Sequence, residues 1–206
     1  MTDAPVILLL AGAADQLGVR MAQDVLRAGG RVAAAVSRAW QVEKPRDQLL
    51  QPGVQSDALL IGVVAGRDAE AAAGFVKGAT DALGAITHLA GASFLLRQRR
   101  PQREPAGDLD EMLDANLHTN VTLARAVLPS MRRRRSGRLI FLNQPSEAEE
   151  LSVTCLASFA AMAAFADALA LDCGAAALQI ESIPAPSDES LTQDWMSVLR
   201  DDTGQS

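Results

Sequence analysis

Hydrophobic residues along this chain fall into short continuous runs separated by longer stretches with helical spacing. The runs end at glycine, proline or small polar residues, as buried parallel strands do. They predict strands at residues 6–10, 31–36, 58–64, 86–89, 138–142 and 178–183. The run at 58–64 contains no polar side chain, so we expect its strand to be covered on both faces.

The stretches between these runs repeat their apolar residues every three to four positions, which predicts amphipathic helices. We expect helices following residue 18 up to Arg27, around 46–50, over 68–83, 108–131 and 152–173, and around 191–199. Residues 95–107 are rich in Arg, Gln and Pro and are expected to form an exposed loop.

The alternation of strands and helices predicts an α/β fold, a Rossmann-like doubly wound parallel sheet of about six strands with helices on both faces. Ligands of such sheets bind beyond the carboxyl ends of the strands. The residues expected at that edge are Gly12, Ser37, Gly62, Gly91, Asn143 and Pro184.

Composition narrows the class of protein. With 206 residues and 49% hydrophobic content, the chain is expected to form one domain over 1–206. A net charge of -6 argues against nucleic-acid or anionic-membrane partners, and no apolar stretch of about 20 residues or basic leader is apparent, so we expect a cytoplasmic protein. Two cysteines and two histidines offer too few ligands for a metal site. The chain has no tyrosine, which excludes any mechanism that needs a phenol.

Three motifs resemble those of the short-chain dehydrogenase/reductase family, and the resemblance covers about residues 6–187. Residues 11–18, Ala-Gly-x-x-x-Gln-x-Gly, correspond to the family's Thr-Gly-x-x-x-Gly-x-Gly. Residues 83–91, Leu-Gly-Ala-Ile-Thr-His-Leu-Ala-Gly, correspond to its Leu-Gly-x-Ile-Asp and Asn-Asn-Ala-Gly segments. Residues 113–117, running into Ala-Val-Leu-Pro at 126–129, resemble its central long helix.

The resemblance implies that the family's catalytic residues are missing. Cys155 and Phe159 stand where the family has the tyrosine and lysine of Tyr-x-x-x-Lys, and its serine should fall near 142–144, where none occurs; Ser146 is out of register. Of the family's four catalytic residues, asparagine, serine, tyrosine and lysine, only the asparagine is retained, as Asn116. Cys155 could act as an acid or nucleophile, or be only a small side chain in an alanine-rich helix. His88 could be a substitute acid or base at the end of strand four, or an ordinary loop histidine, and His118 is most simply a surface or interface residue.

The resemblance also assigns cofactor positions, namely Gly12, Gln16, Leu17, Gly18, Arg38, Ala90 and Gly91. Several are eroded. Gln16 replaces the glycine that lets the backbone approach the pyrophosphate, Gly62 replaces an aspartate that contacts adenine, His88 and Leu89 replace two asparagines, and Pro186 falls near the turn beside the nicotinamide. Arg38 suits a 2′-phosphate, so we expect either no cofactor or weak binding of NADP rather than NAD.

We therefore expect a degenerate family member that lacks the usual C-terminal strand and lid and serves in binding or assembly. The alternatives are an atypical NADP-dependent oxidoreductase using groups such as His88 and Asn116, and a sensor that binds a ligand without turnover. The family's interface helices correspond to 108–131 and 152–173, which predicts a homodimer or a heteromer with a related family member. The arginine runs at 97–103 and 132–138 are expected at opposite edges of the sheet, so they do not form one nucleic-acid-binding patch.

Overall fold

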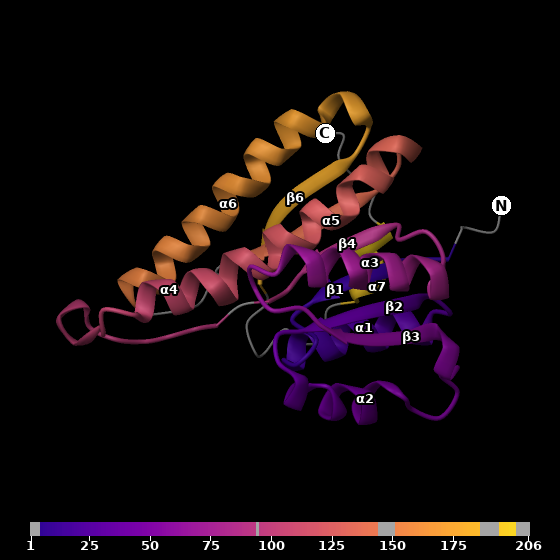
Figure 1. Ribbon diagram of the computed structural model, residues 1–206, viewed down its shortest axis with the longest axis horizontal. Helices are drawn as coiled ribbons and strands as arrows, with labels where there is room; N and C mark the ends of the chain where they lie inside the picture. Colours follow the sequence, from indigo (N-terminus) through magenta and orange to yellow (C-terminus); the bar gives the residue numbers. More distant parts are fainter. Residues whose placement is uncertain (1–4, 94, 144–150, 186–193, 201–206) are drawn as a thin grey trace.

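The computed structural model describes residues 5–93, 95–143, 151–185 and 194–200 (Figure 1). In this part of the chain six parallel strands form one sheet in the order β3-β2-β1-β4-β5-β6. The strands are β1 (Ile7–Ala11), β2 (Arg31–Val36), β3 (Leu59–Val63), β4 (His88–Gly91), β5 (Arg138–Asn143) and β6 (Gln179–Pro184). The strand order reverses between β1 and β4, which confirms the predicted doubly wound Rossmann-like fold.

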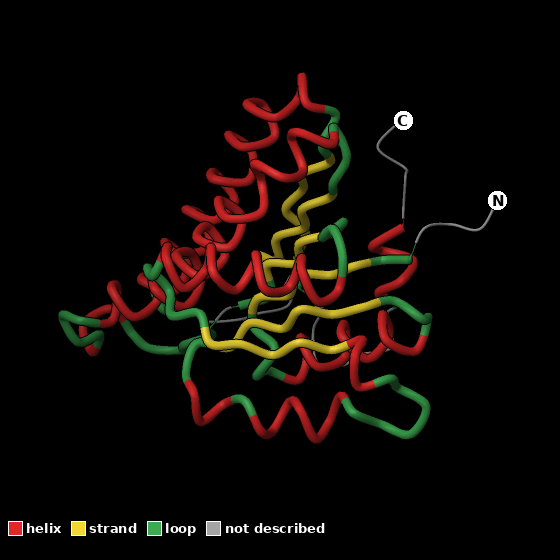
Figure 2. The backbone as a smooth tube through the Cα atoms, turned by 45° about the vertical axis from the view of Figure 1, so that its right-hand side comes forward, coloured by secondary structure: helices red, strands yellow, loops and turns green. Residues whose placement is uncertain are grey.

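Helices cover both faces of the sheet (Figure 2). One face packs against α3 (Ala69–Leu83), α5 (Thr119–Arg134) and α6 (Val153–Cys173), with β-strand residues such as Leu89 and Phe141 in the shared core. The other face packs against α1 (Gln16–Arg27), α2 (Glu43–Leu49) and α7 (Trp195–Arg200), around Leu8, Leu10 and Trp195. Residues 191–193 of the predicted last helix lie outside the described residues.

The third strand is covered on both faces, as predicted, but only in part. β3 is an edge strand that pairs only with β2, and its residues remain partly exposed, with 41% of Val63 accessible to solvent. Its apolar composition reflects contact with one helix layer on each side but no strand beyond it. A continuous apolar run therefore did not distinguish an edge strand from a central one.

The fourth strand begins two residues later than predicted. Residues 86 and 87 form the entry to β4, where the Thr87 hydroxyl accepts a hydrogen bond from the Ile7 N–H and the Ile86 carbonyl accepts one from Arg134. The strand then runs from His88 to Gly91. As a result Gly91 lies inside the strand, and His88 lies at its amino end.

The helix predicted over 108–131 is interrupted. It consists of α4 (Asp108–Leu113), a π-helical turn (Asp114–His118) and α5, which continues to Arg134. π-helical turns are frequent at functional sites, and this one contains the buried Asn116.

The loop at 95–107 is partly built into the fold rather than wholly exposed. Arg97 bridges Asp108 and Glu111 of α4, and Glu104 accepts hydrogen bonds from the backbone N–H groups of Val153 and Thr154 at the start of α6. These contacts tie the loop to the first turns of two helices, at the end of the molecule where the loop projects in Figure 1.

The segment Val153–Ala176 is long and apolar enough to cross a membrane by length and composition alone. The sequence pattern predicted no such stretch, because Asp167 and Asp172 interrupt the apolar run. In the structure α6 packs on β5 and β6, as the core helix of a globular domain does. Its other face is exposed.

Candidate functional site at the carboxyl edge of the sheet

A cleft of about 500 Å³ lies beyond the carboxyl ends of the first four strands. It is lined by Asp15, Ser37, Arg38, Gln41, Ala65, Gly66, Ser93, Leu95, Glu111, Asp114, Ala115 and Thr119. These residues come from the segments that follow β1, β2, β3 and β4, and from α4 and the π-helical turn. The cleft therefore occupies the edge where a doubly wound sheet binds its ligands.

Two glycines fix the turn after β1. Gly12 has φ +85°, and a Cβ on it would lie 2.3 Å from the Ala92 carbonyl oxygen. A Cβ on Gly18 would lie 2.2 Å from the Gly12 carbonyl oxygen. Both positions bring backbone segments into direct contact, so only glycine fits them.

The residues between these glycines divide into two groups. Gln16 is exposed at the first position of α1, whereas Leu17 is buried in the core with Ala90 of β4. Asp15 stands at the N-cap of α1, but its side chain caps no backbone N–H. Desolvation raises the pKa of Asp15, and the charge of Lys44 partly offsets this. A carboxylate thus faces the cleft where an anion would meet the helix N-terminus.

Gly62, which the resemblance assigned to the adenine contact, does not lie at the cleft. Gly62 lies within β3, and a Cβ on it would lie 2.5 Å from the ring of Phe75 in α3. It is needed for packing and does not line the cleft. The chain reaches the cleft three residues later, at Ala65 and Gly66.

His88, predicted as a candidate acid or base at the cleft, also lies elsewhere. It begins β4, three residues or about 10 Å before the carboxyl end of the strand. Its Nε2 is 3.0 Å from the Leu199 carbonyl oxygen of α7, and its Nδ1 is 2.8 Å from the Thr87 hydroxyl. Burial lowers the pKa of His88, and the charges of Arg138 and Arg200 act in the same direction, against the hydrogen bond to Leu199. The ring therefore holds α7 to the sheet.

Asn116 acts as a backbone clamp. Its Oδ1 accepts a hydrogen bond from the Leu95 N–H, and its Nδ2 donates to the Leu95 carbonyl at 3.1 Å and to the Ser158 hydroxyl at 2.8 Å. Ser158 in turn donates to the Cys155 carbonyl at 2.7 Å. The side chain joins the π-helical turn, the loop after β4 and α6, so every polar atom of this buried amide is used within the fold.

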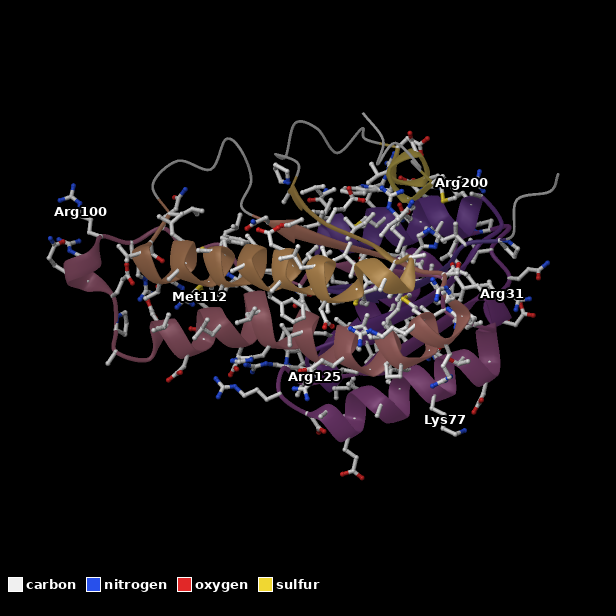
Figure 3. All side chains as sticks on the ribbon, turned by 90° about the horizontal axis from the view of Figure 1, so that it is seen from above. Arg31, Lys77, Arg100, Met112, Arg125 and Arg200 are labelled. Carbon is white, nitrogen blue, oxygen red and sulfur yellow. The ribbon has the colours of Figure 1, made fainter. Side chains whose placement is uncertain are left out.

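Cys155 and Phe159 lie one turn apart on α6 and are both buried. They form a small apolar cluster with Met112 of α4, against which Leu95 and Leu151 also pack. The Cys155 thiol donates to the Leu95 carbonyl at 3.6 Å, and burial raises the pKa of this thiol. The cluster closes the space between α4 and α6, where Met112 is seen in Figure 3.

The arginine runs are engaged with the fold at opposite ends of the sheet. Arg97 and Arg99 pair with Asp108 at the cleft end. At the other end Arg134 and Arg135 donate to the carbonyl oxygens of Ile86 and Ala175. These guanidinium groups satisfy carbonyls and carboxylates of the chain itself.

Comparison with known families identifies the chain. The profile of the short chain dehydrogenase family matches residues 6–194. The chain belongs to the short-chain dehydrogenase family. A search of curated proteins returned no match.

Several solved structures share the fold of this chain. A short-chain dehydrogenase/reductase family oxidoreductase from Burkholderia thailandensis superposes with a TM-score of 0.76 at 22% identity, covering 89% of this chain and 70% of that one. LigO from Sphingobium gives 0.79 at 16% identity, with 93% and 72% covered. Serine dehydrogenase from Escherichia coli gives 0.75 at 22% identity, with 87% and 82% covered. At these identities the likeness concerns the fold.

In this short-chain dehydrogenase, the positions that the resemblance assigns to catalytic residues are packed within the fold. The resemblance assigns the tyrosine and lysine positions to Cys155 and Phe159, which are packed against Met112 rather than facing the cleft. Asn116 has the position assigned to the catalytic asparagine, and the polar atoms of its side chain are hydrogen-bonded to Leu95 and Ser158. Ser146 and Gln144, near the serine position, lie outside the described residues, as does Pro186.

The cleft of this short-chain dehydrogenase does not fit a dinucleotide. Three carboxylates line it, Asp15, Glu111 and Asp114, against the single guanidinium of Arg38 among the described lining residues. A pyrophosphate at the start of α1 would meet Asp15 and the side chain of Gln16. Arg38 is exposed at the rim, where it follows β2.

Sequence reasoning missed the carboxylates of the cleft and the buried Ser158. Glu111 and Asp114 lie in the predicted long helix, Glu111 within α4 and Asp114 at the start of the π-helical turn, and both line the cleft. Asp15 lies within the glycine motif at 11–18. Its negative charge at a helix start that would receive phosphate is unfavourable for phosphate binding, and this could have been recognised from the sequence. Nothing in the sequence pattern signalled that Ser158 would contact Asn116.

Proposed function

We propose that this chain is a non-catalytic member of the short-chain dehydrogenase family, cytoplasmic, whose role is binding and assembly. The packing of Cys155 and Phe159 carries this proposal, because the two family positions that handle the proton and the cofactor ribose are filled by a buried apolar cluster. Burial raises the pKa of the Cys155 thiol and so favours its unreactive form, and the backbone and the charge of Arg97 offset this only in part.

The outer face of α6 supports an assembly role. It exposes Val153, Leu156 and Leu171, with accessible fractions of 55%, 40% and 86%. Between these large side chains the exposed residues are mostly alanines, at 157, 160, 164 and 168. An apolar face of this size on a helix about 30 Å long is typical of a protein interaction surface.

The spacing of these residues suits a second copy packed antiparallel along α6. A twofold axis at the level of Met162 would bring Leu156 against Ala168 of the partner subunit, and Ala160 against Ala164 of the partner subunit. Large side chains would then meet small ones, which permits close packing. A related family member with a similar α6 is the other partner that this surface suits, with 108–131 as the adjoining helical segment.

The assembly is tested by size-exclusion chromatography with light scattering. We expect the wild type to form a dimer, and Ala164→Arg to be monomeric because it places a charge in the packed face. Asp47→Arg, an equally drastic change on the exposed surface of α2, should remain a dimer. A wild type that is monomeric at high concentration, alone and when mixed with a related family member, would contradict the proposal.

The absence of catalysis is tested by titration with NADPH, followed by melting temperature. The proposal predicts no shift, or only a small one at high NADPH concentration, and no NADPH oxidation with carbonyl substrates. By comparison, saturation at 100 times Kd would stabilise the protein by about 2.7 kcal/mol. Arg38 at the cleft rim is the observation that favours the alternative, an atypical NADP-dependent oxidoreductase, and a clear shift with turnover would establish it.

A sensor is the other candidate, favoured by the polar cleft of about 500 Å³. A ligand that stabilises the chain without being transformed would support it. Such a ligand would have to tolerate Asp15, Glu111 and Asp114, so it should be neutral or cationic rather than a dinucleotide.

A further inference from the structure

A second hollow lies outside the carboxyl-edge cleft, in the groove between α3 and α5. It has a volume of about 400 Å³. Its lining consists of Arg67, Ala69, Ala73, His118, Val121, Thr122, Arg125 and Ala126. The three alanines are what makes it a groove, because larger side chains at these positions of two packed helices would fill the space.

The polar groups of this groove are nearly all donors. Arg67 comes from the segment before α3, His118 ends the π-helical turn, and Arg125 lies two turns further along α5. Among the described residues that line it there is no carboxylate, although the chain carries a net charge of -6. In Figure 3 Arg125 lies on the side of α5 that faces away from α6.

One carboxylate stands between the groove and the cleft. Asp114 lines the cleft, and its Oδ1 lies 2.7 Å from Nε of Arg67 and 3.9 Å from Nε2 of His118. Arg67 also lies 4.0 Å from the exposed Asp110. Asp114 therefore pairs with Arg67 and lies close to His118 from outside the groove, and Arg125 has no ion pair among the described residues.

We propose that the groove between α3 and α5 binds a small anion through Arg67, His118 and Arg125, with a phosphate group as the best match. Two guanidinium groups and an imidazole offer several N–H donors from different directions, and arginine binds phosphate in a bidentate manner. The small apolar floor leaves room for the group without imposing an opposing charge. The site is distinct from the cleft.

The groove predicts a specific pattern of phosphate affinity. Inorganic phosphate is titrated into the full chain at constant ionic strength, with chloride as the reference anion, and binding is followed by amide chemical shifts. We expect shifts concentrated at 66–73 and 118–126, and an affinity about tenfold weaker in Arg125→Gln, which removes a charge-assisted pair. Arg133→Gln, an exposed arginine on the same helix outside the groove, should bind like the wild type.

A second variant tests the competition with Asp114. Asp114→Asn removes the carboxylate that holds Arg67 and His118, so phosphate should bind severalfold more tightly than in the wild type, with unchanged circular dichroism. Arg67→Gln should weaken binding. The proposal fails if phosphate does not bind, if Arg125→Gln and Arg133→Gln lose equal affinity, or if Asp114→Asn binds no better than the wild type.

Discussion

Gly12 and Gly78 show that one residue type serves opposite purposes in this chain. Gly12 combines a φ of +85° with close contact to the Ala92 backbone, so it is required by both conformation and space. Gly78 lies inside α3 with nothing near its missing Cβ, where glycine only weakens the helix. Both glycines are equally visible in the sequence, but their roles depend on neighbours far along the chain.

Alanine substitutions should separate these roles. Gly12→Ala should cost more than about 3 kcal/mol in the free energy of unfolding, because strain and overlap add. Gly29→Ala, with φ +77° but open space, should cost about 1–2 kcal/mol from backbone strain alone. Gly78→Ala should stabilise the protein by about 0.5–1 kcal/mol. Urea denaturation measures all three, and equal costs at Gly12 and Gly29 would contradict the packing argument.

His88 should make stability depend on pH. Its folded-state pKa lies below the ordinary value of 6.5, so the unfolded chain binds the proton more readily. The free energy of unfolding should therefore fall as the pH is lowered from about 6.5 towards the folded-state pKa, and level off below it.

His88→Leu should remove this part of the pH dependence, and His118→Gln, the control at the other histidine of the chain, should retain it. Urea denaturation at a series of pH values between 5 and 8 is the measurement. A wild type and a His88→Leu variant with parallel pH profiles would show that the burial of His88 does not control this part of the pH dependence.

At the scale of elements, the side chain of Asn116 joins the loop after β4 to two helical segments. Asn116 bonds both polar groups of the Leu95 backbone and reaches Ser158 on α6. The contact with Arg97 adds to this, since its carbonyl accepts the Ser152 N–H at the start of α6. Asn116 therefore has a structural role, which is to join this loop to the π-helical turn and to α6.

Asn116→Ala should leave the Leu95 N–H without its partner and cost about 3 kcal/mol in the free energy of unfolding. Hydrogen exchange gives the specific readout. The Leu95 amide should exchange much faster in the variant, whereas amides of the central strands such as Leu9 should change only with global stability. A Leu95 amide that stays protected would show that the clamp is dispensable.

At the scale of the whole molecule, the exposed apolar face of α6 is the feature that bears on association. The helix buries one side on β5 and β6 and exposes Leu171, Val153 and a row of alanines on the other. A protein that hides this face by association gains stability from the partner, so its melting temperature must depend on protein concentration.

We expect the melting temperature of the wild type to rise over a hundredfold increase in protein concentration. Ala160→Arg should melt lower and show no concentration dependence, since it disrupts the same face without touching the sheet. Differential scanning fluorimetry or calorimetry provides the measurement. A melting temperature of the wild type that is independent of concentration would contradict self-association.

The hydrophobic pattern by itself determined the fold class, because periods of buried residues dictate strands and helices and their alternation dictates a parallel sheet. It also placed the edge where the cleft lies, and it located the glycines whose backbone contacts fix the first turn. These features depend on local periodicity and on chain connectivity, both of which are written in the sequence.

Only the tertiary structure decided which residues meet. A start of β4 two residues later than predicted placed His88 beside α7 instead of the cleft. The folded chain also placed Glu111 and Asp114 at the cleft and His118 at the α3–α5 groove. Phe159 and Cys155 became a closed cluster because Met112 packs on them. Such contacts depend on register and on helix geometry, which packing energy fixes in three dimensions and which no local pattern specifies.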